Sequence, residues 1–250
     1  MSAGAPRQVI CMKWGTKFPA EDVNRLYRMV RHWVGGDLRF WCVTDHAEGI
    51  DPEIKVLPLP DVPVVGDRLN RGWRKLGLFD PALGGPKGPT VFMDLDVVLV
   101  DKLDVLFELP GEFRVIKDYK RLRYRHSFTG NTSVFRYNAG AHDDLYTELK
   151  ALGPRVFDDY RNEQEFMSDY MRRKGLLQYW PKEWCVSYKY HCVRPLPFGL
   201  WQTPRLPDQA RVLVFHGTPK PEEAVVGIGS KWYRVIRPAP WLERYMNLAG

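Results

Sequence analysis

The stretch Thr90–Val100, TVFMDLDVVLV, decides the expected fold. It begins as an apolar strand that ends in Asp94-Leu95-Asp96. Because side chains two residues apart on a strand point to the same side, both carboxylates can face one point beyond the sheet. Carboxylates this close repel each other unless a cation lies between them, and oxygen ligands of this kind suit Mg²⁺ or Mn²⁺ with positions open for substrate phosphates. The alternative is that the two aspartates only form the turn after the strand.

Short apolar runs alternate with helical patterns on both sides of this stretch. The alternation predicts an α/β domain with a largely parallel sheet, with ligands bound at the carboxyl ends of its strands. The second half carries the more loop-rich elements. The expected strands are 8–13, 38–43, 53–59, 90–94, 97–100, 113–117, 132–137 and 211–215. The expected helices are 21–34, 73–79, one turn within 101–109, 141–152 and 162–174, the last with Asn162 as N-cap.

Composition excludes several classes of protein. A chain of 250 residues can bury a core without disulfides or a structural metal, and 44% hydrophobic residues is too many for a disordered chain. No apolar run reaches the roughly 18 residues of a spanning helix, and the first residues lack the pattern of a secretory signal. We therefore expect a cytoplasmic protein with reduced cysteines. Cys185, His191 and Cys192 do not have the spacing of a zinc site.

The charge balance indicates an anionic partner. Lys and Arg number 37 against 30 Asp and Glu, which gives a net charge of +7. Nucleic acid, phospholipid and a small phosphorylated substrate are all compatible with this surplus.

A second motif follows the strand 211–215. His216 opens the loop His-Gly-Thr-Pro-Lys-Pro, which places an imidazole and the ammonium of Lys220 on one short segment. An imidazole beside two carboxylates shifts the metal preference from Mg²⁺ towards Mn²⁺, and Lys220 would meet a diphosphate as a point charge. A histidine at a strand end also commonly has only a structural role.

These motifs together resemble a known family. The ordered set FMDLDVVLV, NTSVF, NEQEF and FHGTPKP, after an N-terminal strand and helix, is similar to the metal-dependent nucleotide-sugar glycosyltransferases of the A-type fold (GT-A), and most similar to bacterial relatives of glycosyltransferase family eight. The resemblance runs from Val9 to about Pro221. It implies a single Rossmann-like domain with a mixed central sheet flanked by helices. Within it, about 8–118 would form the nucleotide-binding half, about 119–222 the sugar and acceptor half, and 223–250 a C-terminal extension.

The resemblance also implies site residues. Asp94, Asp96 and His216 match the metal ligands, Asp94 also lies near the donor's ribose in that match, and Lys220 matches the lysine on the donor diphosphate. Cys11, Lys13 and Thr16, on the first strand and its loop, match positions near the uracil and ribose, and Lys75 matches one near the sugar and diphosphate. Asp118 and Asn131 match residues that hold the sugar. Glu163, Gln164 and Glu165 occupy the family's Asp-Gln-Asp position, with Glu163 and Gln164 beside the anomeric carbon.

The reaction that the resemblance implies is transfer of a sugar from a nucleotide-sugar, most simply UDP-sugar, with retention of the anomeric configuration. The acceptor would be a glycan or glycolipid. The family's basic C-terminal membrane-binding tail has no clear counterpart, but Trp232, Arg234, Arg237 and Trp241 could touch a membrane surface.

Two other functions remain open from the residues. Phosphatases of the haloacid dehalogenase type also have a strand ending in Asp-x-Asp, but they carry it near the chain start and need paired aspartates after a later strand. Asp143-Asp144 and Asp158-Asp159 are the candidates for that pair. Alternatively, the segment 114–125, with Arg114, Lys117 and further cations interleaved with tyrosines, could bind nucleic acid.

Overall fold

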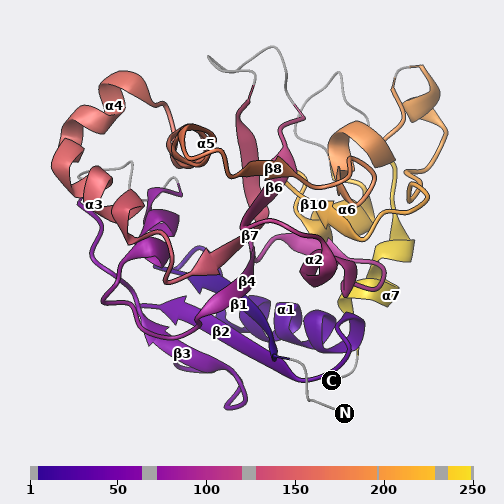
Figure 1. Cartoon of the computed structure of the whole chain (residues 1–250). Helices are drawn as coiled ribbons and strands as arrows, with labels where there is room; N and C mark the ends of the chain where they lie inside the picture. Colours follow the sequence, from indigo (N-terminus) through magenta and orange to yellow (C-terminus); the bar gives the residue numbers. More distant parts are fainter. Residues whose placement is uncertain (1–4, 64–71, 120–127, 196, 229–235, 249–250) are drawn as a thin grey trace.

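A seven-stranded sheet forms the centre of the computed structural model, which describes residues 5–63, 72–119, 128–195, 197–228 and 236–248 (Figure 1). The strand order is β3-β2-β1-β4-β7-β6-β8. These strands are β1 Arg7–Lys13, β2 Leu38–Thr44, β3 Lys55–Pro58, β4 Gly88–Met93, β6 Phe113–Lys117, β7 Gly130–Ala139 and β8 Leu177–Tyr179.

The sheet is mixed, as the resemblance implies, because its two halves differ in strand direction. β1 pairs in parallel with both β2 and β4, and β2 pairs in parallel with β3. β7 runs antiparallel to β4 and to β6, while β8 is parallel to β6. The parallel half therefore brings the carboxyl ends of β1, β2, β3 and β4 to one edge, where loops can build a site.

A small second sheet continues directly from the central one. It consists of β5 Val97–Leu99, β10 Val212–Val214 and β9 Cys185–Ser187 in the order β5-β10-β9. β10 runs antiparallel to β5 and parallel to β9. Asp94-Leu95-Asp96 thus joins the end of β4 in one sheet to the start of β5 in the other.

One face of the central sheet is covered by α1, Ala20–Trp33. Val23, Leu26, Tyr27 and Val30, which have the i, i+3, i+4, i+7 spacing of one helix face, are all buried in the first hydrophobic cluster. The helix ends with Val34 in an extended conformation, and Gly36 follows at φ 77°, a left-handed angle that favours glycine. The face is thus covered as the helical spacing predicts.

The opposite face is covered by the second cluster and its helices. They are η2 Trp73–Phe79, a 3-10 helix, α3 Asp143–Leu152, η3 Gly153–Arg155, α4 Val156–Asp159 and α5 Glu163–Arg173. Asn162 caps α5 as predicted, by accepting a hydrogen bond from the Glu165 amide at 3.0 Å. The Glu165 side chain accepts from the Arg161 amide instead of the N-cap amide, so the reciprocal bond of a capping box starts one residue earlier.

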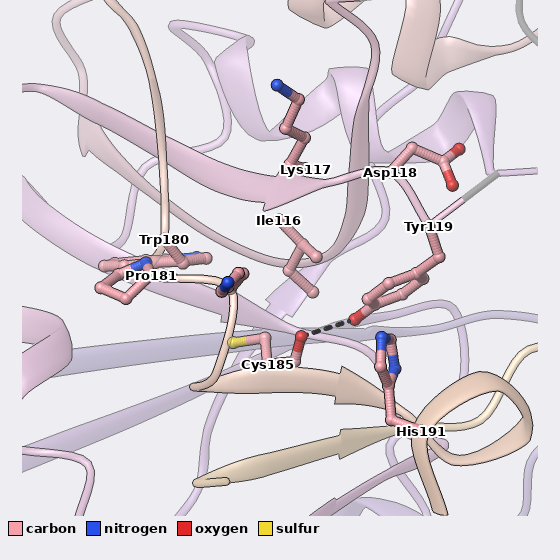
Figure 2. Close-up of a pocket in the computed structure, with 9 residues that line it drawn as sticks. Ile116, Lys117, Asp118, Tyr119, Trp180, Pro181, Cys185 and His191 are labelled. Carbon is pink, nitrogen blue, oxygen red and sulfur yellow. Dashed lines mark hydrogen bonds between the residues drawn. The ribbon is translucent and has the colours of Figure 1, made fainter. Parts of the chain in front are cut away.

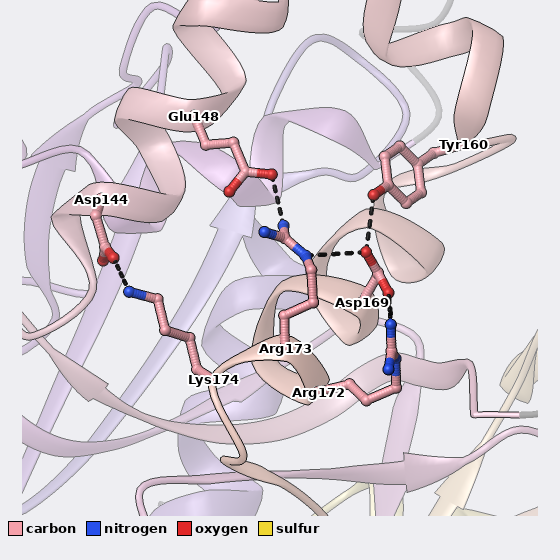
Figure 3. Close-up of polar contacts among 7 residues, drawn as sticks. All are labelled: Asp144, Glu148, Tyr160, Asp169, Arg172, Arg173 and Lys174. Atoms are coloured by element: carbon pink, nitrogen blue, oxygen red, sulfur yellow. Dashed lines mark hydrogen bonds and ion pairs between the residues drawn. The ribbon is translucent and has the colours of Figure 1, made fainter.

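Charged residues join α3 to the C-terminal turn of α5 (Figure 3). Arg173 pairs with Glu148 at 2.5 Å and with Asp169 at 3.1 Å, and Lys174 pairs with Asp144. We refer to these residues as the α3–α5 network. It lies at the far end of α5 from Glu163 and Gln164.

The remaining helices are short. α2 Val105–Glu108 lies within 101–109, where one helical turn is predicted. The others were not predicted and are the π-helix Tyr188–Cys192, η5 Phe198–Leu200, α6 Pro221–Val226, η6 Pro240–Leu242 and α7 Glu243–Met246. Leu242, Tyr245 and Met246 pack into the first cluster. The end of the described chain is thus part of the core. No helix among the described residues is long and apolar enough to cross a membrane.

Candidate functional site

The candidate site lies where the order of the sheet reverses. From β1 the chain continues to β2 on one side, and β4 lies on the other side. Loops leaving such a point diverge, and the crevice between them is where α/β sheets bind ligands. Asp94 follows β4 at this position, and its amide donates to the Ser133 carbonyl at 2.8 Å. The Asp-x-Asp motif therefore occupies the position that the sequence predicts.

A buried lysine holds the first aspartate. Lys75 Nζ lies 2.7 Å from Asp94 Oδ1 and donates to the Thr132 carbonyl at 3.1 Å, with only 6% of its side chain exposed. Burial raises the pKa of Asp94, Lys75 opposes that shift, and the neighbouring charge of Asp96 adds to it. Asp94 is thus a carboxylate whose charge depends on a nearby cation.

A second lysine holds the second aspartate. Lys220 Nζ lies 2.5 Å from Asp96 Oδ2, across 124 positions of sequence. The Lys220 ammonium is also 5.3 Å from the centre of the Phe18 ring, on the loop after β1. Lys220 is the N-cap residue of α6, where its amide donates to Glu223. The site therefore contains two lysine–carboxylate pairs side by side along the motif.

His216 lies against the same segment. β10 ends at Val214, which pairs with Val97 at the start of β5, so His216 follows β10 at the end where Asp96 precedes β5. Its Nε2 lies 2.7 Å from Ser187 Oγ, and Lys189 donates to its carbonyl. The backbone therefore brings His216 to the motif, while its ring is bonded to β9.

The donor set fits a divalent ion in its chemistry. Two carboxylates and an imidazole suit Mn²⁺ or Mg²⁺. In the described part of the chain, however, no three histidine, cysteine or acidic side chains are gathered as a metal site. Each of the three is instead held by a neighbour: Asp94 by Lys75, Asp96 by Lys220 and His216 by Ser187. Metal binding would require these pairs to exchange partners.

Glu163 and Gln164 begin α5 beside the first pair. Glu163 is 2% exposed and accepts from Thr132 Oγ1 at 3.2 Å, and burial is the main cause that raises its pKa, opposed by the charge of Lys75. Gly72 beside it adopts φ 99°, a left-handed angle that favours glycine, and a Cβ there would lie 2.6 Å from Glu163 Oε1. Oε2 of Glu163 and Oε1 of Gln164 are buried without a hydrogen-bond partner among the described residues. Such acceptors favour a polar ligand.

Asn131 and Asp118 lie further along β7 and β6. Asn131 is 8% exposed and its Oδ1 accepts from the Ser133 amide at 3.0 Å, next to the residues that hold Lys75. Asp118 follows β6, and its amide donates to the Thr129 carbonyl at 3.3 Å. Asn131 is therefore brought to the Asp94 pair, whereas Asp118 belongs to a neighbouring pocket.

That pocket has a volume of about 210 Å³ (Figure 2). Tyr119 borders it, with its hydroxyl donating to the Cys185 carbonyl at 2.9 Å and its ring stacked 5.9 Å from that of His216. Ligand sites typically measure about 300–1,000 Å³, so this pocket would hold part of a ligand. It is lined by Ile116, Lys117, Asp118, Tyr119, Trp180, Pro181, Lys182, Cys185 and His191.

The first strand contributes less side-chain chemistry than the resemblance implies. Cys11 is fully buried, and burial together with Cys42 raises its pKa, so its thiol faces the core. Lys13 is 4% exposed and donates to the His46 carbonyl at 3.4 Å. Thr16 is exposed on the loop that leads to Phe18. Any contact of Cys11 with a ligand would be through its main chain.

Of the residues invoked for the two other functions, those that the structure describes do not form a site. Arg114 bonds the Pro110 and Tyr179 carbonyls, Lys117 lies 5.3 Å from the Tyr179 ring, and 120–127 lie outside the described residues. The candidate phosphatase aspartates lie on helices: Asp143 and Asp144 begin α3, and Asp158 and Asp159 end α4.

Several residues of the site were not predicted. Ser187, Lys189 and Tyr119 surround His216, and Thr132 joins Lys75 to Glu163. Thr132 follows Asn131 in the quoted NTSVF motif, so the motif itself could have indicated it. Ser187 and Lys189 lie on β9 and the π-helix, which carry no clear periodicity in the sequence.

Comparison with solved structures shows the fold. The chain superposes on an active-site mutant of LgtC with a TM-score of 0.63 at 13% identity, covering 97% of this chain and 95% of that one. It also matches the galactosyltransferase LgtC in complex with donor and acceptor sugar analogs, with a TM-score of 0.55 at 13% identity over 86% and 88% of the two chains. For the glycosyltransferase GlyE of Streptococcus pneumoniae the TM-score is 0.59 at 12% identity, over 98% of this chain and 61% of that one. No protein-family model and no curated protein matches the sequence. The fold is that of the A-type glycosyltransferases.

Proposed function

We propose that this protein is a glycosyltransferase that transfers a sugar from a nucleotide-sugar, most simply a UDP-sugar, to a glycan or lipid-linked acceptor. The observation that carries the proposal is the double lysine–carboxylate pair at the switch point of the sheet, Lys75 with Asp94 and Lys220 with Asp96. The shared fold with LgtC and GlyE supports it. We also propose that the protein acts in the cytoplasm.

The two lysines suit a diphosphate leaving group. When the bond between the anomeric carbon and the diphosphate breaks, negative charge develops on the phosphate oxygen, and positioned cations stabilise it. Lys220, with 30% of its side chain exposed, can leave Asp96 for the diphosphate, whereas the buried Lys75 stays with Asp94. Mn²⁺ or Mg²⁺ held by Asp94, Asp96 and His216 would supply further Lewis-acid stabilisation of that charge when bound.

The buried acceptors suit a sugar. Glu163 Oε2 and Gln164 Oε1 are buried acceptors without partners among the described residues, Asn131 lies on β7, and Asp118 follows β6. Carboxylates near a sugar that becomes oxocarbenium-like stabilise positive charge and fix hydroxyl groups. In this proposal Gln164 lies nearest the reacting carbon and the anomeric configuration is retained. LgtC has been solved as an active-site mutant in which a glutamine is replaced by glutamate, which agrees with a central role for a glutamine.

Thermal unfolding with a panel of nucleoside diphosphates, with and without Mn²⁺, tests the proposal. A ligand at a hundred times its dissociation constant adds about 2.7 kcal/mol of stability, which should raise Tm by about 5–10 °C in a chain of this size. We expect a metal-dependent shift with UDP that Asp96→Asn removes. The matched control is Asp101→Asn, an aspartate of the same strand segment whose carboxylate pairs with Arg211 instead. If no nucleotide in the panel raises Tm, or if the rise survives both chelator and Asp96→Asn, the proposed site is wrong.

A further inference from the structure

A large cavity lies at the opposite end of the parallel strands from the candidate site. Its volume is about 570 Å³, within the range of about 300–1,000 Å³ that is typical of ligand pockets. Residues at the starts of β1, β2, β3 and β4 line it, whereas Asp94 follows the end of β4. β1 has seven residues and is about 20 Å long, so the cavity is separate from the candidate site. We call it the amino-edge pocket.

Positive charge dominates the wall of the amino-edge pocket. The cations that line it are Arg7, Arg39, Lys55 and Lys87. None of its described lining residues is aspartate or glutamate. Arg7 is neutralised by ion pairs with Asp104 and Glu108 on the α2 side. The other three form no ion pair with a carboxylate of the described chain, so they can bind the charges of a ligand.

These three cations form a row across the sheet. Lys55 begins β3, Arg39 lies on β2, and Lys87 directly precedes β4. The strand order there is β3-β2-β1-β4, and the four strands lie side by side in Figure 1. Because neighbouring strands are about 4.8 Å apart, the backbone positions of the row span about 14 Å across the sheet. A row of this length suits a linear anion with several charges better than a single oxyanion.

The floor of the pocket is the sheet itself. Trp41 pairs with Lys55 in the parallel register of β2 and β3. Arg39, two residues before Trp41, pairs with Gln8 of β1. Paired residues and residues two apart on a strand share a face, so these side chains lie on one face of the sheet. Gln8 is 6% exposed, and its Nε2 donates to the Lys87 carbonyl at 2.7 Å, which holds the segment before β4 beside β1.

Apolar side chains complete the wall of the pocket. They are Trp41, Pro89 and Phe107, among others. The Lys55 ammonium lies 5.0 Å from the centre of the Trp41 ring. The Arg7 guanidinium lies 5.7 Å from the centre of the Phe107 ring. One face of each ring is thus covered by a cation, which disfavours stacking of nucleic-acid bases. The C–H groups of sugar rings can pack against such a wall, whereas a polyphosphate has no apolar surface to bury.

We propose that the amino-edge pocket binds a linear acidic saccharide at a second site, outside the candidate active site. Its carboxylates pair with Arg39, Lys55 and Lys87, and its rings pack against Trp41 and Pro89. Arg39 can bind a carboxylate through two parallel hydrogen bonds, whereas the lysines act as point charges. The inference does not depend on the proposed function, because the pocket shares no residue with the Asp94 and Asp96 pairs.

The C-terminal residues named from the sequence form no comparable cluster in the described chain. Trp232 and Arg234 lie outside the described residues. Trp241 is half-buried, and its Nε1 donates to the Pro204 carbonyl at 3.0 Å. Arg237 is exposed. In the described structure the amino-edge pocket, and not the C-terminus, therefore presents several cations together to the anionic partner that the net charge of +7 indicates.

Thermophoresis of the full chain with acidic tetrasaccharides, without nucleotide or metal, tests the inference. The probes are tetramers of galacturonate and of mannuronate. We expect at least one of them to bind, and its methyl ester, which has the same rings without the charges, to bind at least about tenfold more weakly. Binding of the acid should also weaken as the salt concentration rises.

The pocket variant carries Arg39→Gln, Lys55→Gln and Lys87→Gln. It should bind the acidic tetramer about tenfold or more weakly than the wild type, because three exposed ion pairs are lost. The metal-dependent shift with UDP should be the same in this variant, which shows that it is folded and lets the two proposals fail separately.

The matched control carries Lys150→Gln, Arg155→Gln and Lys174→Gln, which removes the same number of exposed charges outside the pocket. Like Lys55, Lys150 lies over an aromatic ring, that of Tyr146 at 4.5 Å. This control should bind the tetramer like the wild type.

Four results would each overturn the inference. Neither tetramer binds the wild type, or the pocket variant binds as tightly as the wild type. Inorganic tripolyphosphate binds more tightly than both tetramers and loses its binding in the pocket variant, which would make this a phosphate site. UDP with Mn²⁺ displaces the tetramer, which would place the saccharide in the candidate active site.

Discussion

The site and the α3–α5 network both join lysine or arginine to carboxylates, but they do so in different surroundings. At the site, Lys75 and Asp94 have 6% and 24% of their side chains exposed, and Lys220 and Asp96 have 30% and 16%. In the network, Lys174 and Asp144 have 49% and 53% exposed. The pairs at the site are therefore largely shielded from water, whereas the Lys174–Asp144 pair is about half exposed to it.

This difference separates exposed pairs, which have little effect on stability, from buried pairs, whose charges need an explanation. Exposed ion pairs contribute little because water screens them. Buried pairs are costly to form, and removing one partner leaves an unpaired charge. A fold that only needed stability would do as well with apolar residues at Lys75 and Asp94. The buried pairs are therefore best explained by a ligand that uses their charges, which is the basis of the proposed function.

Removing Lys75 should give the largest loss of stability. Lys75→Met leaves Asp94 buried beside Asp96 without its cation, which should cost about 3 kcal/mol and lower Tm by about 6–12 °C. Thermal unfolding without ligands measures it. Adding Asp94→Asn to Lys75→Met removes the unpaired charge and should recover part of the loss. If the double variant is less stable than Lys75→Met, the burial argument for this pair is wrong.

The pKa of Glu163 predicts a smaller effect that depends on pH. Because burial raises its pKa in the folded protein, the stability that protonation provides is present below its ordinary pKa and is lost as the pH rises through the raised value. Glu163→Gln should therefore raise Tm by about 2–4 °C at neutral pH and by little near about pH 4, close to the ordinary carboxyl pKa. Paired melting curves at the two pH values measure the difference. An equal gain at both would show that the carboxylate charge is not its cause.

The α3–α5 network should respond least. Lys174→Ala removes an ion pair whose two side chains are about half exposed, so it should change the free energy of unfolding by about 0–1 kcal/mol. Chemical denaturation in low and high salt measures this change, and any loss should shrink in high salt because exposed charges are screened. A loss as large as that of Lys75→Met would remove the distinction between the two regions.

The fold was predictable because its information is local. The spacing of Val23, Leu26 and Val30 predicts the buried face of α1, and the apolar run before Asp94 predicts β4. The Asp-x-Asp motif could be placed for the same reason, since a strand fixes where its last residues point. The short elements β8, β9 and the π-helix could not be predicted, because they are three to five residues long and are held by partners distant in the chain.

The partners within the site were less predictable than its members. Lys220 was expected on a diphosphate and lies on Asp96, 124 residues away in sequence. Ser187 bonds His216 from a strand with no sequence pattern of its own. The exposure of Phe198 and Trp201 could not be predicted either, because the sequence of a proline-rich stretch does not show whether its apolar side chains are buried or exposed. Such contacts depend on the tertiary fold and not on local spacing.

Calorimetric titration of UDP and of uridine, both with Mn²⁺, into the wild type and Lys220→Ala tests the central claim most directly. If Lys220 exchanges Asp96 for the diphosphate, the variant should bind UDP about 10–100-fold more weakly, the loss of one charged hydrogen bond, and uridine within about twofold of the wild type. Lys174→Ala, at an exposed lysine of the α3–α5 network, is the control and should bind both ligands normally. Equal weakening of UDP and uridine by Lys220→Ala, or no binding of UDP to the wild type, would contradict the account.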